Sequence, residues 1–173
     1  MDTHLLRLVA DGLVLREWTS NDLAVMQGLF DDPDVAYRTP LKSPFDQAAA
    51  VHYLHSAQRA QRNSDRIHLA ITTDGRMALG EILLNRATGS IGYMVGASHR
   101  GQGLAARALR MMTDFAHTAA ALPRVLLEIE PDNHPSIAVA RSAGFRQSNS
   151  PHETVTDKGR TYDLLAWEHN LPA

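Results

Sequence analysis

The stretch Arg100-Gly101-Gln102-Gly103-Leu104-Ala105 lies between two segments of different hydrophobic periodicity. The run Ile91-Gly92-Tyr93-Met94-Val95 before it is typical of a β-strand, and the apolar spacing from Leu104 to Phe115 predicts a helix. The first N–H groups of a helix have no internal partner, and they form an anion site together with the positive end of the helix dipole. The small residues of the stretch leave the approach to these amides open, and Arg100 adds a positive charge. We therefore predict a strand–loop–helix junction that binds a phosphate group.

The spacing around the glycines does not fit the two common nucleotide motifs. No Lys-Ser or Lys-Thr pair follows them, as a Walker loop requires. A dinucleotide fingerprint would need glycine near Ala106 and an acidic residue about 20 positions further on. The stretch instead resembles the Gln/Arg-x-x-Gly-x-Gly/Ala pyrophosphate signature of the GNAT superfamily of acetyl-CoA-dependent N-acetyltransferases, with Arg100, Gly103 and Ala105 at the matching positions. A plain turn is the alternative for the hexamer alone.

Other segments extend this resemblance over most of residues 13–167. Asn133-His134-Pro135-Ser136 and Gly144-Phe145 are similar to the N-x-x-S and Gly-Phe segments of the superfamily. Leu15-Arg16, Asp22-Leu23 and Asp31-Asp32-Pro33-Asp34-Val35 are similar to the opening of the RimJ/RimL-type branch, which is known for acetylating protein N-termini. The chain departs from the pattern where Met94 replaces tryptophan, Ala97 replaces proline and Ala140 replaces a common tyrosine.

Length and composition fit one N-acetyltransferase domain over residues 1–173. Of its 173 residues, 44% are hydrophobic and 21% are charged, which is ordinary for a globular protein. The sequence has no cysteine, no apolar run of transmembrane length and no signal-like segment, so we expect a cytoplasmic protein without membrane contact. With 17 basic and 19 acidic residues, no nucleic-acid partner is expected.

The apolar spacing predicts alternating strands and helices. The expected elements are a strand at Leu13–Arg16, a helix after the Thr19-x-x-Asp22 cap, a helix starting at Ser43-Pro44, strands at 67–71, 79–84 and 91–95, the helix from Leu104, a strand at Val125–Ile129, a helix at 135–143 ending before Gly144, and a strand at Tyr162–Trp167. This order indicates an α/β (α+β) class, and the resemblance implies a GNAT-like fold. It predicts a mixed, mostly antiparallel central sheet of about six to seven strands with helices on both faces.

The resemblance implies acetyl-CoA as co-substrate at the glycine-containing loop. It also implies that backbone N–H groups near the end of the preceding strand bind the oxyanion and the pantetheine arm. The residues it assigns to the cofactor are Met94, Val95, Gly96, Arg100, Gly101, Gln102, Gly103, Leu104, Ala105, Asn133 and Ser136. No metal is expected, because His52 and His55 lack an H-E-x-x-H context and cysteine ligands, and a solvated helix face explains them.

Acetyl transfer to an amine needs a neutral amine, donors for the oxyanion and a proton for the departing thiolate. The resemblance places Ser136 near the sulfur, so Ser136 is the expected acid and Asn133 is expected to orient the pantetheine arm. Helix capping is the alternative for both. Candidates for the base or a proton relay are Glu81, Glu128, Glu130, Tyr93 and Tyr162, with Tyr162 also the next candidate for the acid. Solvent exposure or ion pairing is the alternative for the carboxylates.

The expected activity is transfer of acetyl from acetyl-CoA to a primary amine by direct attack in a ternary complex. An N-terminal α-amino group of a protein or peptide is the leading acceptor, because its pKa near 8 demands a weaker base than the pKa of about 10.4 of lysine. A small-molecule amine such as an aminoglycoside is the first alternative, and a non-catalytic acyl-CoA-binding domain is the second. The sequence leaves open the acceptor, the base, the acyl length and the oligomeric state, including a homodimer.

Overall fold

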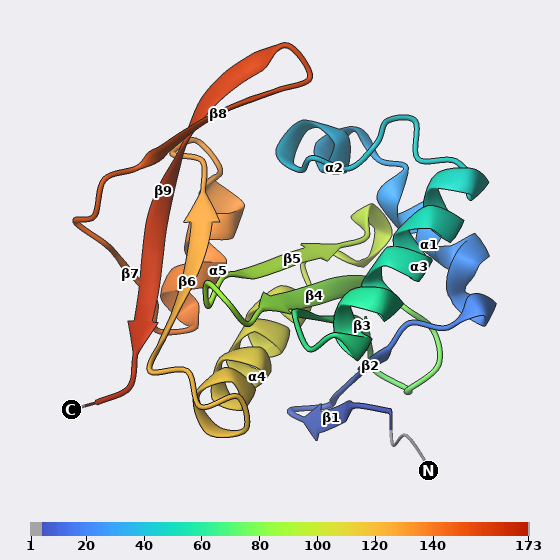
Figure 1. Cartoon of the computed structure of the whole chain (residues 1–173), viewed down its shortest axis with the longest axis horizontal. Coiled ribbons are helices and arrows are strands. Elements are labelled where there is room, and N and C mark those ends of the chain that lie inside the picture. Colours follow the sequence, from blue (N-terminus) through green and yellow to red (C-terminus); the bar gives the residue numbers. More distant parts are fainter. Residues whose placement is uncertain (1–4, 173) are drawn as a thin grey trace.

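The computed structural model describes residues 5–172 as a mixed α/β fold. Its elements follow in the order β1 (Arg7–Ala10), β2 (Leu13–Glu17), η1 (Ser20–Asp22), α1 (Leu23–Phe30), α2 (Pro33–Arg38), α3 (Gln47–Arg62), β3 (Arg66–Thr72), β4 (Gly80–Asn85), β5 (Ile91–Val95), η2 (Ala97–His99), α4 (Leu104–Thr118), β6 (Arg124–Ile129), α5 (His134–Ser142), β7 (Arg146–Gln147), β8 (Glu153–Asp157) and β9 (Arg160–Asn170). Figure 1 shows this arrangement.

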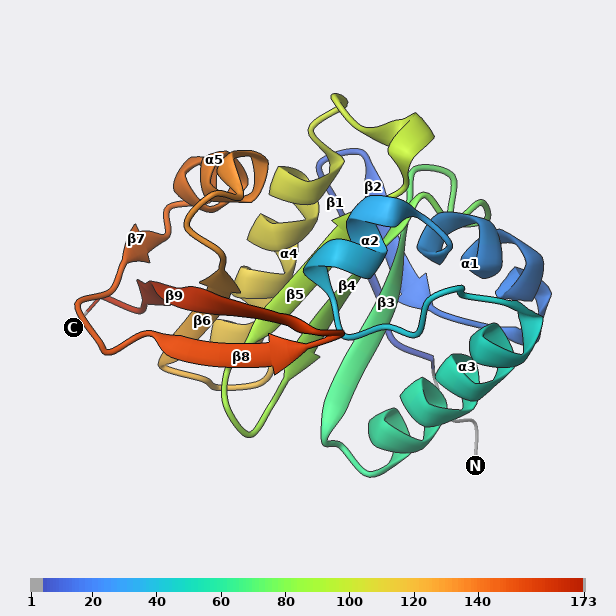
Figure 2. The ribbon, with the colours of Figure 1, turned by 90° about the horizontal axis from the view of Figure 1, so that it is seen from above.

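The N-terminal half is a five-stranded antiparallel sheet in the order β1-β2-β3-β4-β5. Helices α1 and α3 cover one face and α4 covers the other, as Figure 2 shows. Side chains of a strand alternate between the two faces. Leu69 and Ile71 of β3 accordingly pack in the cluster with α4, whereas Ala70 packs in the cluster with α1 and α3. The sheet is thus buried on both faces.

The C-terminal half is a second antiparallel sheet in which β6 and β7 pair with β9, and β8 also pairs with β9. An isolated parallel bridge between Ser90 and Leu126 links it to β5. Beyond this bridge β5 and β6 run apart (Figure 1). The edge of β5 that faces β6 therefore lies at the end of the first sheet without a strand beside it.

These observations confirm the predicted α/β class, and several local predictions hold. Thr19 and Asp22 form the expected capping box, residues 66–95 form three antiparallel strands, and α4 begins at Leu104. One helix boundary is wrong: α3 begins at Gln47 and not at Ser43-Pro44. The reason is that the Asp46 side chain itself caps the helix, with Oδ1 accepting a hydrogen bond from Ala49 N–H at 2.8 Å.

The sequence analysis missed β1, α2, β7 and β8, so the structure has sheets of five and four strands in place of one sheet of six to seven. Helix α2 carries a clear start signal, because Asp32 Oδ1 accepts hydrogen bonds from Asp34 N–H and Val35 N–H and Pro33 occupies the first turn. With six residues, however, it is too short to show an apolar period.

Candidate functional site

A cleft of about 480 Å³ lies between α2, β5, the start of α4 and the start of α5. Its size is in the usual range for small-molecule sites. It is lined by Asp34, Val35, Arg38, Thr39, Tyr93, Met94, Val95, His99, Arg100, Gly101, Gly103, Leu104, Ala105, Ala106, Asn133, Pro135, Ser136 and Val139. The structure thus brings together all the residues predicted to bind the cofactor, apart from Gly96 and Gln102, which are not in the lining.

One end of the cleft is the N-terminus of α4. Gly103 is its N-cap, and both Gly101 and Gly103 have positive φ angles of +81° and +70°. A Cβ atom at either glycine would have no neighbour within 4 Å, so these positions face open space, and no side chain caps the helix. The unpaired amides of the first turn of this 15-residue helix are therefore free to bind an anion.

The open edge of β5 forms one wall of the cleft. Gly96 N–H is not free, because it donates to the Leu79 carbonyl at 2.8 Å. Successive N–H groups point to opposite edges of a strand, so Met94 N–H also faces β4 and Val95 N–H faces the open edge. Among the three backbone groups predicted to bind the oxyanion, Val95 N–H has the suitable direction.

Ser136 lies in the first turn of α5, opposite β5. Its Oγ is 2.8 Å from the Tyr93 hydroxyl, which also lies 3.1 Å from the Ser136 carbonyl oxygen. Burial raises the pKa of Tyr93, and the hydrogen bond with Ser136 offsets part of this rise. Asn133 is the N-cap of α5, where its Oδ1 accepts a long hydrogen bond of 3.4 Å from Ser136 N–H. Capping is thus observed for Asn133, whereas the Ser136 hydroxyl contacts Tyr93.

Arg100, at the rim of the cofactor loop, contacts the start of α2. Its Nη1 is 3.1 Å from Asp34 Oδ2, and its Nη2 is 3.6 Å from Asp32 Oδ1. Its Nε donates to the Val95 carbonyl at 3.3 Å. All these groups are partly exposed, so the ion pairs are weak and readily exchanged for another anion.

Arg38, which lines the cleft, belongs to a group of ion pairs around Glu130, which is 5% exposed and is not itself in the lining. Arg38 of α2 donates to Glu130 Oε2 at 2.9 Å, and Arg160 of β9 binds both carboxylate oxygens at 2.9 and 2.8 Å. Arg38 also binds Asp132 at 2.8 Å, and this hydrogen bond lowers the pKa of Asp132. Both lone-pair edges of Glu130 are thus occupied by guanidinium groups.

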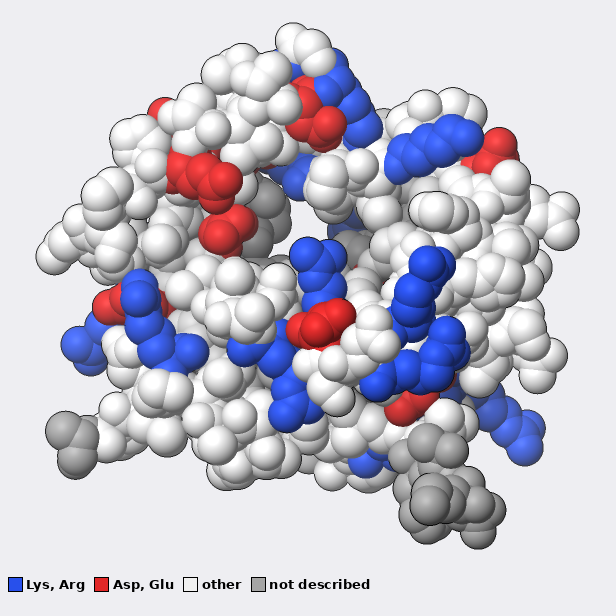
Figure 3. All heavy atoms as spheres, viewed as in Figure 1, with Lys and Arg blue, Asp and Glu red and all other residues white. Residues whose placement is uncertain are grey.

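The hairpin of β8 and β9 reaches across to α2, and we call its turn, residues 157–160, the strap. Lys158 Nζ donates to the carbonyls of Ala36 and Thr39 at 2.8 and 3.0 Å, and Arg160 Nη2 donates to the Tyr37 carbonyl at 2.6 Å. Figure 2 shows the tip of the hairpin beside α2, and Figure 3 shows an opening through the molecule below this contact. The strap closes that side of the opening.

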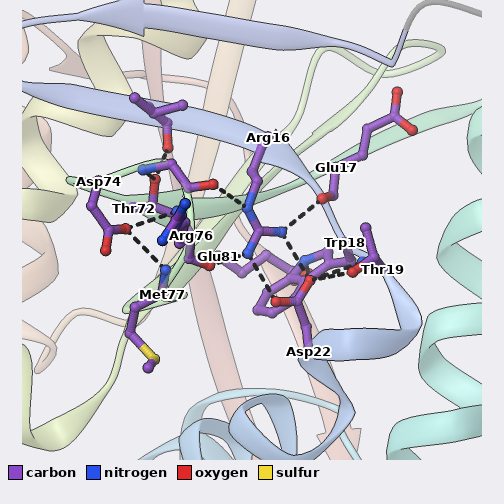
Figure 4. A network of polar contacts seen from close by, with 12 residues as sticks. Arg16, Glu17, Trp18, Thr19, Asp22, Thr72, Asp74, Arg76, Met77 and Glu81 are labelled. Carbon is purple, nitrogen blue, oxygen red and sulfur yellow. Dashed lines mark hydrogen bonds and ion pairs between the residues drawn. The ribbon is translucent and has the colours of Figure 1, made fainter.

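Glu81 is 4% exposed and is not in the cleft lining, although its cross-strand partner Met94 is. Trp18 Nε1 donates to its Oε2 at 2.8 Å and the Tyr53 hydroxyl to its Oε1 at 2.5 Å. His68 Nδ1 is 3.6 Å from Oε2. Burial and the charge of Glu81 raise the pKa of Tyr53 well above its usual value. Figure 4 shows Glu81 with Trp18, beside the contacts of Arg16 with Asp22 and with the turn after β3.

Tyr162 does not line the cleft. Its ring lies under the Arg160 guanidinium, 4.1 Å from ring centre to Cζ. Burial raises the pKa of Tyr162, with a further rise from Asp157, while Arg160 lowers it. Of the four predicted catalytic residues, the structure therefore places Ser136 in the cleft, and it gives Glu81, Glu130 and Tyr162 other contacts.

The sequence analysis gave no role to Asp34, Arg38, Lys158 or Arg160. Their contacts join residues that are from 66 to 123 positions apart in the chain, and no local pattern marks such pairs. Within residues 5–172, no group of three or more His, Cys, Asp or Glu side chains could hold a metal ion. None of the helices described in that range is long and apolar enough to cross a membrane.

Known proteins share this sequence pattern and fold. Residues 12–146 match the family model described as acetyltransferase (GNAT) domain. An uncharacterized N-acetyltransferase, p20, of Bacillus licheniformis is 26% identical over 163 residues, covering 91% of this chain and 92% of its own.

Two solved structures show the same fold. The RimJ protein of Mycobacterium smegmatis, in complex with CoA-disulfide, superposes with a TM-score of 0.79 at 24% identity, covering 96% of this chain and 86% of its own. The ribosomal-protein-S5-alanine acetyltransferase of Vibrio fischeri gives 0.80 at 16% identity, covering 95% and 96%. Since the family match takes in the open strand, the glycine-containing loop and α5, the chain belongs to the GNAT family of acetyl-CoA-dependent N-acetyltransferases.

Proposed function

We propose that this chain transfers the acetyl group of acetyl-CoA to the N-terminal α-amino group of a protein or peptide, by direct attack in a ternary complex. The observation that carries the proposal is the cleft itself. It contains both an uncapped helix N-terminus and a serine hydroxyl. A phosphate group and a reacting thioester thus have separate sites within one cleft.

The cofactor is assigned to the loop and the open strand edge. Its pyrophosphate binds the first amides of α4, with the glycines leaving room and Arg100 adding charge. The Val95 N–H, which faces the open edge of β5, serves as the oxyanion donor. Loss of one such donor typically costs about 10²–10³-fold in rate.

Ser136 is assigned as the proton donor to the departing thiolate. Its hydroxyl lies inside the cleft and is not used to cap α5, since Asn133 fills that role. Asn133 is further assigned to orient the pantetheine arm. This second role and the capping role are separable, because loss of a cap lowers stability by about 1 kcal/mol and loss of a ligand contact raises the cofactor KM.

An α-amino acceptor needs only a weak general base, because about a tenth of such groups are already neutral at pH 7. Glu81, Glu130 and Tyr162 remain candidates, although their observed contacts favour structural roles. Glu128 of β6 is a further candidate, and burial and the nearby charge of Glu153 raise its pKa. Glu128 is, however, exposed and is not in the cleft lining, so the raised pKa alone does not make it a better candidate than the other carboxylates.

The fold relatives support the choice of acceptor. One is named as a RimJ protein and the other as an acetyltransferase of an alanine of a ribosomal protein. Because the identities are low, these names support an N-terminal amine as the class of acceptor and do not identify the individual substrate.

Thiol release from acetyl-CoA tests the proposal. Peptides with a free N-terminus, the same peptides with a blocked N-terminus and an aminoglycoside are offered in turn. We expect repeated turnover with the free N-terminus. Binding of CoA with no thiol release from any amine would indicate an acyl-CoA-binding domain, and preference for the aminoglycoside would indicate a small-molecule enzyme.

A substitution pair tests the proton donor. Ser136→Ala should lower kcat by roughly 10²-fold with little change in the KM of acetyl-CoA. Ser142→Ala is the matched control, because Ser142 is exposed at the far end of α5 and its hydroxyl bonds only to the Val139 carbonyl among the described residues. If Ser136→Ala keeps full kcat, the proton donor is another group.

A further inference from the structure

The partly buried hydroxyl of Tyr93 lines the cleft and is not used in the proposed function. Tyr93 comes from the middle of β5, and its hydroxyl lies 2.8 Å from Ser136 Oγ across the gap between β5 and α5. Both residues line the cleft. The pair is therefore a direct contact between the open strand and the helix that carries the assigned proton donor.

The hydrogen-bond count at this pair allows two arrangements. A tyrosine hydroxyl has one proton to donate. When Tyr93 donates to the Ser136 carbonyl at 3.1 Å, it can accept the hydroxyl proton of Ser136, which is then unavailable to a substrate. When Tyr93 donates to Ser136 Oγ, the serine proton is free to point into the cleft. The direction of the Tyr93 hydroxyl thus decides whether Ser136 can act as a donor.

Serine alone is a poor acid for this step. An aliphatic hydroxyl is far less acidic than a thiol with a pKa of about 8.5, whereas a phenol, with an ordinary pKa near 10, is closer, even though burial raises the pKa of Tyr93. Transfer from serine to a thiolate is accordingly more favourable when a second proton moves to the serine at the same time. The contact of Tyr93 with Oγ offers such a second proton.

We propose that Tyr93 is a positioning residue that turns the Ser136 hydroxyl toward the departing sulfur and replaces the proton that Ser136 gives up. This inference rests on the assignment of Ser136 as proton donor in the proposed function.

The proton balance of the step is closed. As the carbon–sulfur bond breaks, the Ser136 proton passes to sulfur, and the Tyr93 proton passes to Ser136 Oγ. The new amide nitrogen loses one proton after attack, and this proton returns through water to Tyr93. The sum is one amine and one thioester giving one amide and one thiol, with both hydroxyl groups restored.

A double-mutant cycle in single-turnover thiol release tests the relay. Tyr93→Phe keeps the ring and removes the hydroxyl, and we expect it to slow release by about 10-fold to 10²-fold with an unchanged CoA thermal shift. Tyr93→Phe with Ser136→Ala should be no slower than Ser136→Ala alone, because both changes interrupt one path. Ser142→Ala is the control for hydroxyl removal, because Ser142 is exposed, lies outside the cleft lining, and bonds through its hydroxyl to the Val139 carbonyl.

Mixtures of H₂O and D₂O give a readout that a purely structural role would leave unchanged. Two protons move in the transition state of the wild-type chain, so its rate of thiol release should depend on deuterium content in a curved way. Only one proton moves in Tyr93→Phe, so the dependence there should be linear. Wild-type rates in Tyr93→Phe, or effects of the two substitutions that multiply, would overturn the relay while leaving Ser136 as the donor. Full activity of Ser136→Ala would overturn the proposed proton donor and the relay with it.

Discussion

The two ends of the cleft are built in different ways. The cofactor end is one continuous stretch from β5 through the loop to α4, and it presents backbone amides with open space around two glycines. The other end, which we assign to the acceptor, is bounded by α2, the end of β6 and the strap, and charged side chains hold these segments together. The first end is shaped by backbone conformation and the second by ion pairs between distant segments.

The two kinds of construction suit two kinds of ligand, an invariant cofactor and a variable acceptor. Backbone amides at a helix start recognise phosphate in any protein that exposes them, so this end suits an invariant cofactor. Contacts between side chains of separate segments can change one residue at a time, which suits an end that selects the acceptor. Substitutions at the two ends should accordingly affect different kinetic constants.

The largest effect is expected at the cofactor end. Gly103→Glu forces a side chain into a backbone with φ of +70° and adds a negative charge at the anion site. We expect the CoA-induced thermal shift to disappear. Gly159→Glu is the matched control, because Gly159 has φ of +73° and the same open surroundings but lies in the strap. If the CoA-induced thermal shift persists in Gly103→Glu and disappears in Gly159→Glu, the cofactor binds at the strap and not at the start of α4.

A smaller effect is expected from the ion pairs at the acceptor end. Glu130→Gln removes the charge that Arg38 and Arg160 share, and we expect the free energy of unfolding to fall by about 2 kcal/mol. The acceptor KM should rise while CoA affinity stays the same. Urea unfolding and CoA titration measure both.

Glu168→Gln serves as the control for this change. Glu168 pairs with Arg124 at 2.7 Å, but both side chains are partly exposed, and such pairs contribute about 0–1 kcal/mol. If Glu130→Gln weakens CoA binding as strongly as acceptor binding, the two ends are not independent.

A still smaller effect is expected where the two ends touch. Asp34 lines the cleft and pairs with Arg100 at 3.1 Å, so it competes with a phosphate for the same guanidinium. Asp34→Asn should strengthen CoA binding about 2-fold to 5-fold, and the gain should shrink at high salt. Asp65→Asn, an exposed change outside the cleft, should leave CoA affinity unchanged. Weaker CoA binding in Asp34→Asn would show that Asp34 supports the cofactor end.

The smallest effect on function is expected from Asp22, outside both ends (Figure 4). Burial alone would raise the pKa of Asp22, but hydrogen bonds from Arg16 and Thr19 outweigh it, and the net pKa is lowered. This carboxylate therefore stabilises the fold above its unfolded pKa of about 3.9, and the contribution is lost as pH falls through the lower folded value. Urea unfolding between pH 2 and 6 should show a shallower acid loss in Asp22→Asn, whereas an unchanged slope would remove Asp22 from the acid response.

The same difference explains what the sequence could predict. The cofactor end follows from neighbours in the chain, since Gly101, Gly103 and the apolar period of α4 are visible in the sequence. The acceptor end depends on pairs such as Lys158 with Ala36 and Arg160 with Glu130, which meet only after folding. The sequence therefore offered Glu81 and Glu130 as candidate bases, with exposure or ion pairing as the alternative, and the structure shows both with hydrogen-bond partners.

Local signals also failed where elements are short. Strand β7 has two residues and α2 has six, so neither reaches the length at which periodicity is informative. The cap signal at Asp32-Pro33 was the available clue to α2, and it also marks the helix that joins both ends of the cleft.

The most direct test of the central claim is to locate the acetyl group on a peptide that carries both a free N-terminus and an internal lysine. The peptide is incubated with acetyl-CoA and the wild-type chain, and fragment masses assign the modified nitrogen. We predict acetylation of the α-amino group, with a rate that rises to about pH 8 and then levels as the free amine saturates. Acetylation of the lysine, or of an added aminoglycoside in preference to either peptide nitrogen, would contradict the proposed acceptor.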